Sequence, residues 1–194
     1  MAIDESTLLR AGGLSAIAAI VALIVSGITV ALFFGGAGSY WGPVNDLATA
    51  VTLVALLLPV VAVDRLARLQ AGIWLDVVTV AAIAGIVLAA VGQLLLVAGA
   101  IDLETSFVTG GVGIVPVFAW LAAVAILALG LGVLPAHVGW LALGVIVLSA
   151  GLTVIAGAGT GPTMWIAAVA LLAVLAGWMA SLGMTLLDRG AAAA

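Results

Sequence analysis

Long apolar stretches, separated by short polar connections, dominate the pattern of this chain. Six such stretches each run for roughly 20 residues or more, the length that a helix needs to cross a hydrocarbon core of about 30 Å. The expected helices span residues 10–34, 44–63, 73–99, 113–134, 138–158 and 163–187. The pattern predicts an all-α, polytopic membrane protein in which residues 1–194 form a single transmembrane domain.

The positions of the charged residues predict how these helices are oriented. With six spans, both termini and the 64–72 and 134–138 connections lie on one side of the membrane. The arginines all fall on that side, and they are Arg10, Arg65, Arg68 and Arg189. Asp46, Asp102 and Glu104 fall on the other side, where the chain has no basic residue. Because basic residues accumulate on the cytoplasmic side, we expect both termini in the cytoplasm and the protein in the plasma membrane.

The six helices are expected to form three hairpins that turn on the outer side. The second helix of each begins in a similar way, with "GPVNDLATAV", "GIVPVFAWLAAVA" and "GPTMWIAAVA". This likeness indicates an internal duplication or a shared packing rule, and chance similarity between apolar segments is the alternative. The acidic leader "MAIDESTLLR" favours a retained first helix, capped by Asp4 or Ser6, over a cleaved signal peptide.

Composition excludes several classes of protein and of chemistry. Hydrophobic residues make up 67% of the chain and charged residues 6%, whereas soluble domains carry about 25% charged residues. The chain has no cysteine, which excludes thiolate metal sites, and no lysine, which excludes Schiff-base cofactors. His137 is the only histidine, and the net charge of −4 argues against nucleic-acid binding. We expect no metal and no cofactor.

Polar residues inside the expected spans are the best candidates for a site, because each must be paired or face water. Asn45, Thr49 and Thr52 are spaced to share one face of their helix. Gln93 on the next helix lies at a similar depth, so we expect it to contact the preceding helix near Thr49. The outer half of the membrane holds Ser26, Thr29, Asn45, Asp46, Thr49, Thr52, Gln93, Ser149 and Thr153.

Two interpretations of this polar set stay open. The residues either join neighbouring helices by hydrogen bonds, each worth about 0.6 kcal/mol, or line an outward-facing polar pocket. Such a pocket would lie among the helices at 10–34, 44–63, 73–99 and 138–158, with Asp46 at its edge.

Other residues in the sequence favour structural roles. Asp64 and Arg68 are spaced as an ion pair, on an extension of the second helix into the headgroup layer. Trp120 and Trp178 lie deeper than the interfacial aromatic residues, and we expect them to fill gaps between helices. His137 is expected in water at the membrane surface.

The expected outer connection at 100–112 combines glycines with acidic residues. Asp102 and Glu104 either bind a cation there or are simply solvated. The segments 110–116 and 157–162 are rich in glycine, and we interpret both as outer turns.

Small residues spaced four apart predict close packing of helices. One ridge runs through Gly27 and Ala31, and another runs through Ala173, Gly177 and Ser181. Such ridges let backbones approach, either within the chain or between the subunits of a homo-oligomer or a larger assembly. The expected partners are therefore the lipid bilayer and other membrane-protein subunits, with no nucleic acid.

The segment "YWGPVNDLATAVTLVALLLPVVA" resembles families of small six-helix integral membrane proteins of bacteria and archaea. In these families a W/F-G-P-x-N/S-D element opens the second helix, and a proline follows near the end of that helix. The resemblance covers roughly residues 38–62, and the families have no assigned activity. It implies a six-helix membrane fold and no catalytic residue.

The sequence contains no G-x-S-x-G, H-E-x-x-H or phosphate-binding-loop motif. We therefore expect a non-enzymatic membrane protein, either an accessory or scaffold subunit of an assembly or a homo-oligomer. The alternative is a small transporter, channel or ligand binder with an outward-facing pocket around Asp46, Thr49 and Gln93. An enzyme acting on lipid is a third hypothesis, with no nucleophile–base pair to support it.

Overall fold

The computed structural model describes residues 4–157 and 161–194 and folds them into six long helices. In chain order these are α1 (Glu5–Phe34), α2 (Trp41–Ala71), α3 (Ile73–Val97), α4 (Leu103–Leu129), α5 (Ala136–Gly157) and α6 (Pro162–Ala192). Each of the six is long and apolar enough to cross a membrane. The expected all-α fold of six long apolar helices is confirmed for the described residues.

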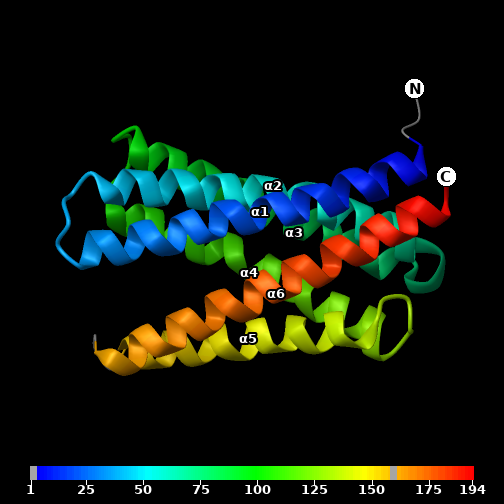
Figure 1. Cartoon of the computed structure of the whole chain (residues 1–194). Helices are drawn as coiled ribbons and strands as arrows, with labels where there is room; N and C mark the ends of the chain where they lie inside the picture. Colours follow the sequence, from blue (N-terminus) through cyan, green and yellow to red (C-terminus); the bar gives the residue numbers. More distant parts are fainter. Residues whose placement is uncertain (1–3, 158–160) are drawn as a thin grey trace.

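The helices are arranged in a ring in which chain neighbours lie side by side and α6 returns to pack against α1 (Figure 1). Both termini lie at one end of the bundle, which we call the terminal end. The connections from α1 to α2 and from α3 to α4 lie at the other end, which we call the opposite end (Figure 1).

The start of α4 differs from the expected one. Asp102 occupies the N-cap position of α4, and its carboxylate accepts a hydrogen bond of 2.8 Å from the backbone N–H of Thr105. This hydrogen bonding holds the pKa of Asp102 below its usual range. The expected loop at 100–112 and turn at 110–116 are therefore wrong, because a side-chain cap starts the helix at Leu103, upstream of the glycines.

The ends of other helices agree in part with those predicted from the sequence. Asp4 lies at the N-cap position of α1, although its carboxylate forms no capping bond and instead accepts a hydrogen bond from the Ser6 hydroxyl. α2 runs on to Ala71, so the expected extension of the second helix past residue 63 is confirmed. Residues 158–160 of the expected turn at 157–162 lie outside the described residues.

Glycines bring helix backbones into direct contact at two places in the ring. Between α3 and α4, a Cβ added to Gly113 would lie 2.6 Å from the carbonyl oxygen of Gly85. Between α1 and α6, a Cβ added to Gly13 would lie 2.7 Å from the carbonyl oxygen of Gly183. Neither contact leaves room for a side chain, so these glycines set how closely the helices approach.

The separation of α1 and α6 grows from the terminal end to the opposite end. Backbones touch at Gly13, whereas at Gly27 the contact is with the side chain of Leu172, 2.9 Å from an added Cβ. Further along, the rings of Phe34 and Trp165 meet edge to face with their centroids 6.1 Å apart. Larger side chains thus hold the two helices progressively further apart.

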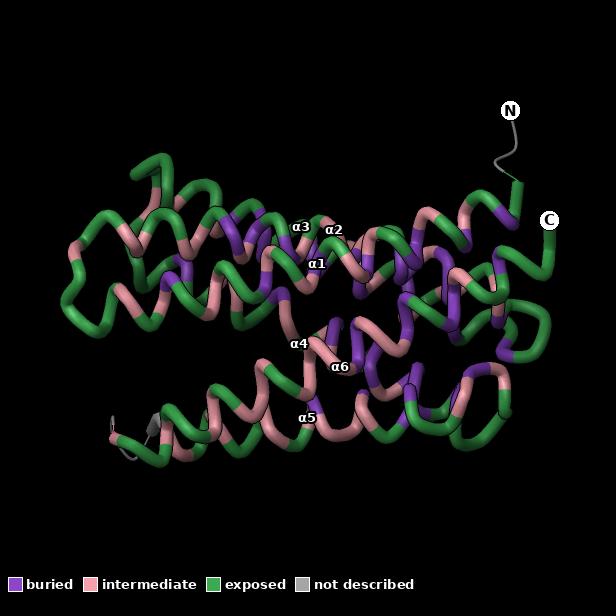
Figure 2. Tube along the Cα trace, in the orientation of Figure 1, coloured by how far each residue is buried: buried purple, intermediate pink, exposed green. Residues whose placement is uncertain are grey.

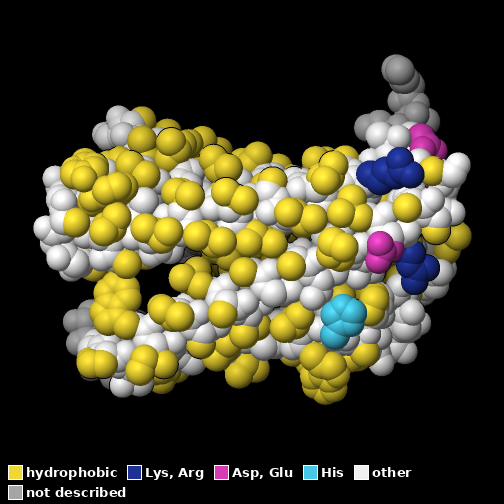
Figure 3. All heavy atoms as spheres, viewed as in Figure 1, with side chains coloured by type: hydrophobic (Ala, Val, Ile, Leu, Met, Phe, Trp, Pro, Cys, Tyr) yellow, Lys and Arg dark blue, Asp and Glu magenta, His cyan; other side chains and the backbone are white. Residues whose placement is uncertain are grey.

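Burial follows the same gradient along α5 and α6. Every buried residue of α6 lies at or beyond Trp178, in the half nearer the terminal end. Figure 2 shows that the buried positions gather towards the terminal end of the bundle, while α5 and the first half of α6 are mainly intermediate or exposed. Figure 3 shows an opening between α1 and these two helices at the opposite end.

We predict that Gly113→Ala destabilises the fold, because its methyl group would press on the backbone of α3. Overpacking of this kind costs about 1–3 kcal/mol, and the midpoint of thermal unfolding in detergent should fall accordingly. Gly111→Ala is the matched control on the same helix, since an added Cβ there meets nothing within 4 Å. A midpoint that falls equally in both variants would contradict the close α3–α4 contact.

Candidate functional site

A pocket of about 320 Å³ lies among α1, α2, α3 and α4, and four of the polar residues that the sequence singled out line it: Asn45, Asp46, Thr49 and Gln93. We call it the polar pocket. Its polar lining comes from Asn45, Asp46, Thr49, Gln93 and Ser106. The rings of Phe33, Phe34 and Phe107 are part of the same wall. The pocket therefore combines one carboxylate, two amides and two hydroxyls with an aromatic surface.

Hydrogen bonds between α1 and α2 position the α2 side of the polar pocket. The Ser26 hydroxyl on α1 donates to Asn45 Oδ1 at 2.8 Å and shares a hydrogen bond of 2.9 Å with the Thr49 hydroxyl. The Asn45 amide then donates to Asp46 Oδ1 at 3.4 Å. This chain fixes the Asn45 amide and links it to the half-buried carboxylate of Asp46.

Gln93 lies where the sequence predicts, in the same pocket as Thr49. Within the described part of the chain, no hydrogen bond joins Gln93 to α2, so a direct contact stays a prediction. The sequence prediction of which helix forms the fourth wall of the pocket is wrong. It is α4 and not the helix at 138–158, because the ring places α5 beyond α4.

The remaining polar residues of the predicted set are not in the polar pocket. Three threonine hydroxyls donate to carbonyl oxygens of their own helix: Thr29 to Val25, Thr52 to Ala48 and Thr153 to Ser149, at 2.8–2.9 Å. Hydrogen bonding between helices is thus confined, within this set, to Ser26 and its partners on α2. These three threonine hydroxyls therefore find their hydrogen-bond acceptors on their own helices.

A second cavity, of about 220 Å³, lies at the centre of the ring and is lined by all six helices. We call it the central cavity. Its wall is almost entirely apolar, with hydroxyls contributed by Ser26, Thr49, Thr52 and Ser149. Thr49 lines both the polar pocket and the central cavity, so the two adjoin at the Ser26–Thr49 hydrogen bond.

Trp120 and Trp178 pack against each other beside the central cavity. Their rings meet edge to face with centroids 5.8 Å apart, and each residue is only 1% exposed. Both residues are therefore buried between helices, as the sequence predicts, while their role as gap fillers stays a prediction. Both residues also line the central cavity, and the buried Nε1 of each has no hydrogen-bond partner among the described residues.

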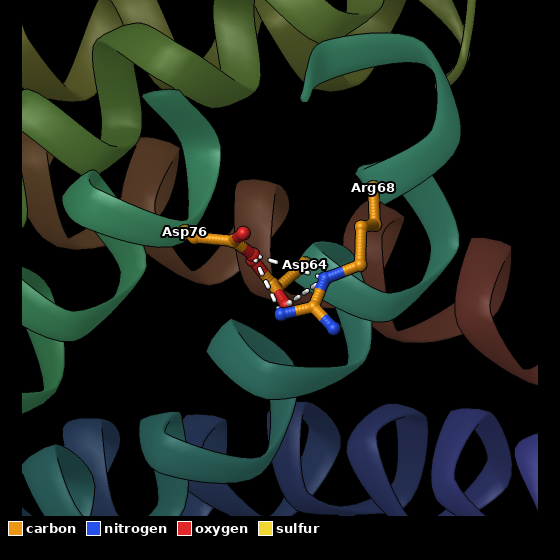
Figure 4. Close-up of polar contacts among 3 residues, drawn as sticks. All are labelled: Asp64, Arg68 and Asp76. Carbon is orange, nitrogen blue, oxygen red and sulfur yellow. Dashed lines mark hydrogen bonds and ion pairs between the residues drawn. The ribbon is translucent and has the colours of Figure 1, made fainter. Parts of the chain in front are cut away.

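An ion-pair cluster joins α2 to α3 at the terminal end (Figure 4). Arg68 Nη2 and Nε lie 2.8 and 3.0 Å from Asp76 Oδ1, and Arg68 Nε lies 3.9 Å from Asp64 Oδ2. The expected Asp64–Arg68 pair is confirmed, but the sequence analysis missed Asp76 as the closer partner. The half-exposed Arg68 side chain bridges the two helices across the turn at Gly72.

Charge is distributed unevenly between the two ends. All four arginines belong to the first turns of α1 or the last turns of α2 and α6, which lie at the terminal end. Asp46 lines the polar pocket, and Asp102 and Glu104 begin α4 at the same opposite end. The polar pocket is therefore set in an electronegative end of the molecule.

We predict that water fills the polar pocket. In a Gln93→Cys variant of this cysteine-free chain, the thiol should react with a charged methanethiosulfonate reagent in liposomes. Leu94→Cys is the matched control, because Leu94 is 45% exposed on the apolar surface, where a thiol stays protonated and unreactive. Equal protection of both thiols, measured by mass spectrometry, would mean that the pocket is closed by packing.

Comparison of the chain with protein-family models, with curated proteins and with solved structures gives no match. The resemblance at residues 38–62 therefore stays a prediction. The polar pocket and the central cavity are the features on which a functional proposal rests.

Proposed function

We propose that this chain is a non-enzymatic membrane protein that binds an organic cation in its polar pocket. The observation that carries the proposal is the half-buried carboxylate of Asp46, which shares the pocket with Asn45, Gln93 and three phenylalanine rings. The sequence analysis gave ligand binding as an alternative function, and the proposal now specifies the ligand as positively charged and organic.

The composition of the pocket favours an organic cation over a metal ion. A metal such as Ca²⁺ requires about six to eight oxygen ligands around a small site, whereas much of this pocket is aromatic or aliphatic. Aromatic faces attract ammonium-type cations with about 0.5–2 kcal/mol each. A carboxylate supplies the opposite charge, and the pocket volume of about 320 Å³ suits a small organic molecule.

The proposed orientation places the opposite end outside the cytoplasm. Concentration of the arginines at the terminal end supports cytoplasmic termini, a plasma-membrane location and three hairpins that turn outward. In that orientation the polar pocket faces the extracytoplasmic side. The glycine contacts that pack the terminal half favour a binding protein over an open channel.

A scaffold or accessory role is the second candidate, and α6 is the surface that favours it. Ala173 is exposed, and a Cβ added to Gly177 would meet nothing within 4 Å, so the ridge that continues to Ser181 stays open along this part of α6. The corresponding ridge on α1 is already used within the chain, because Gly27 packs against Leu172. A partner subunit or a second copy would therefore dock on α6.

The cation proposal is tested by equilibrium binding of radiolabelled tetraphenylphosphonium to the purified chain in nanodiscs. We expect saturable binding that weakens about tenfold, or about 1.4 kcal/mol, in Asp46→Asn. Glu104→Gln removes the same charge at the same end but outside the pocket, and it should leave the affinity within about twofold of the parent. Absence of saturable binding, or equal losses in both variants, would refute the proposal.

A further inference from the structure

We propose that the central cavity holds one acyl chain of a membrane phospholipid, which enters between α1 and α6. This site is separate from the proposed cation site. Among the described residues, the wall of the central cavity contains no charged side chain, whereas the polar pocket contains the carboxylate of Asp46. Neither proposal depends on the other.

The cavity extends along the helices, which gives it the shape of a linear chain. Its wall on α2 follows one face of that helix and consists of Thr49, Thr52, Leu53, Leu56 and Val60. The rise from Thr49 to Val60 is about 16 Å at 1.5 Å per residue, and the whole cavity measures about 220 Å³. A space that is long for its volume fits a single hydrocarbon chain better than a compact ring system. Because the six helices are long enough to cross a membrane, the cavity lies parallel to the lipid chains around it.

The chemistry of the wall favours a ligand without polar groups. Three of its hydroxyls already have partners in the protein: Ser26 and Thr49 share a hydrogen bond, and Thr52 donates to the carbonyl oxygen of Ala48. A buried water needs two to four polar partners, and the rest of the wall is apolar, so it offers water none. Lipid tails are as apolar as a leucine side chain and match this wall.

The opening between α1 and α6 supplies a route from the hydrocarbon of the membrane. Ser26 and Leu171 line the cavity, and the residues that follow them, Gly27 and Leu172, meet where the opening begins. Figure 3 shows the gap beyond this level, at the opposite end. An acyl chain therefore enters sideways while its headgroup stays outside the protein.

Filling the cavity with an acyl chain is favourable. The chain leaves one hydrocarbon environment for another, so no polar group has to be desolvated. It also gains the packing contacts that the lining side chains lack around an empty space.

The test uses a phosphatidylcholine with a photoreactive diazirine near the end of one acyl chain, in liposomes that contain the full protein. After illumination, mass spectrometry should locate adducts on buried residues of the cavity wall, namely Leu56, Val117 and Val145. These residues are at most 9% exposed, whereas Val147 is 67% exposed and reports the lipids that surround the protein. Adducts confined to exposed residues such as Val147 would overturn the proposal.

A second probe distinguishes a phospholipid from a free fatty acid as the source of the chain. This probe is a fatty acid with the diazirine at the same position, added to the same liposomes. We expect the phospholipid to label Leu56 and Val117, because the opening faces the bilayer in which the phospholipid chains lie. Labelling of these residues by the free acid alone would overturn the assignment to a phospholipid.

A cavity-filling variant tests whether the adducts depend on the space itself. Val145 lines the cavity from α5, and Val145→Phe places a ring in it. Adducts on Leu56 and Val117 should fall about tenfold, since each methylene that is excluded loses favourable burial. Undiminished adducts in this variant would overturn the proposal.

Val147→Phe is the matched control, because it makes the same change on the exposed face of the same helix. It should leave the cavity adducts within about twofold of the parent, as expected for a surface substitution. An equal loss of cavity adducts in Val147→Phe and Val145→Phe would contradict the proposal.

A second filling variant keeps the proposal testable if Val145→Phe fails to fold. Leu175 lines the cavity from α6, and Leu175→Phe fills the same space from another side. A single monodisperse peak in size-exclusion chromatography identifies the folded variants. Parental levels of the adduct on Leu56 in folded Leu175→Phe would show that no acyl chain occupies the cavity.

Discussion

The direct contact between the backbones of α1 and α6 at Gly13 and Gly183 is the constraint on which the rest of the structure depends. It joins the last helix to the first and so closes the ring near the terminal end. Because no side chain fits there, the contact is as close as two helices allow. Further along, Leu172 and then the Phe34–Trp165 pair hold the helices apart. A ring that is tight at one end and spread at the other encloses the central cavity.

The spread half of the ring contains two chemically different compartments. The polar pocket has a carboxylate and amides against phenylalanine rings, while the central cavity is almost wholly apolar. The hydrogen bond between Ser26 and Thr49 lies where they adjoin. Since unpaired polar groups are costly in hydrocarbon, this bond lets α1 and α2 pack against each other between the polar compartment and the apolar one.

Hydropathy alone was sufficient to predict that there are six long helices and roughly where each one lies, because a helix that crosses a membrane needs about 20 apolar residues. The equal depth of Thr49 and Gln93 likewise predicted their common pocket. What failed depended on the cap that Asp102 gives to α4 or on contacts between helices. Gly113 resembled a turn residue because its partner, Gly85, lies on another helix. Predicting the fourth wall of the pocket would have needed the order of the helices in the ring. Predicting that the indole nitrogens of Trp120 and Trp178 lack partners would have needed their surroundings in the fold. A local sequence pattern contains neither.

The most direct test of this account is the distance between α1 and α6 at two levels, measured by electron–electron double resonance in nanodiscs. The chain has no cysteine, so spin labels can be attached singly to introduced ones. Leu14 with Met184 reports near the glycine contact, and Ala31 with Val169 reports near the opening; all four are exposed. The account predicts a short, narrow distance for the first pair and a longer, broader one for the second. Equal distances at both levels would contradict it.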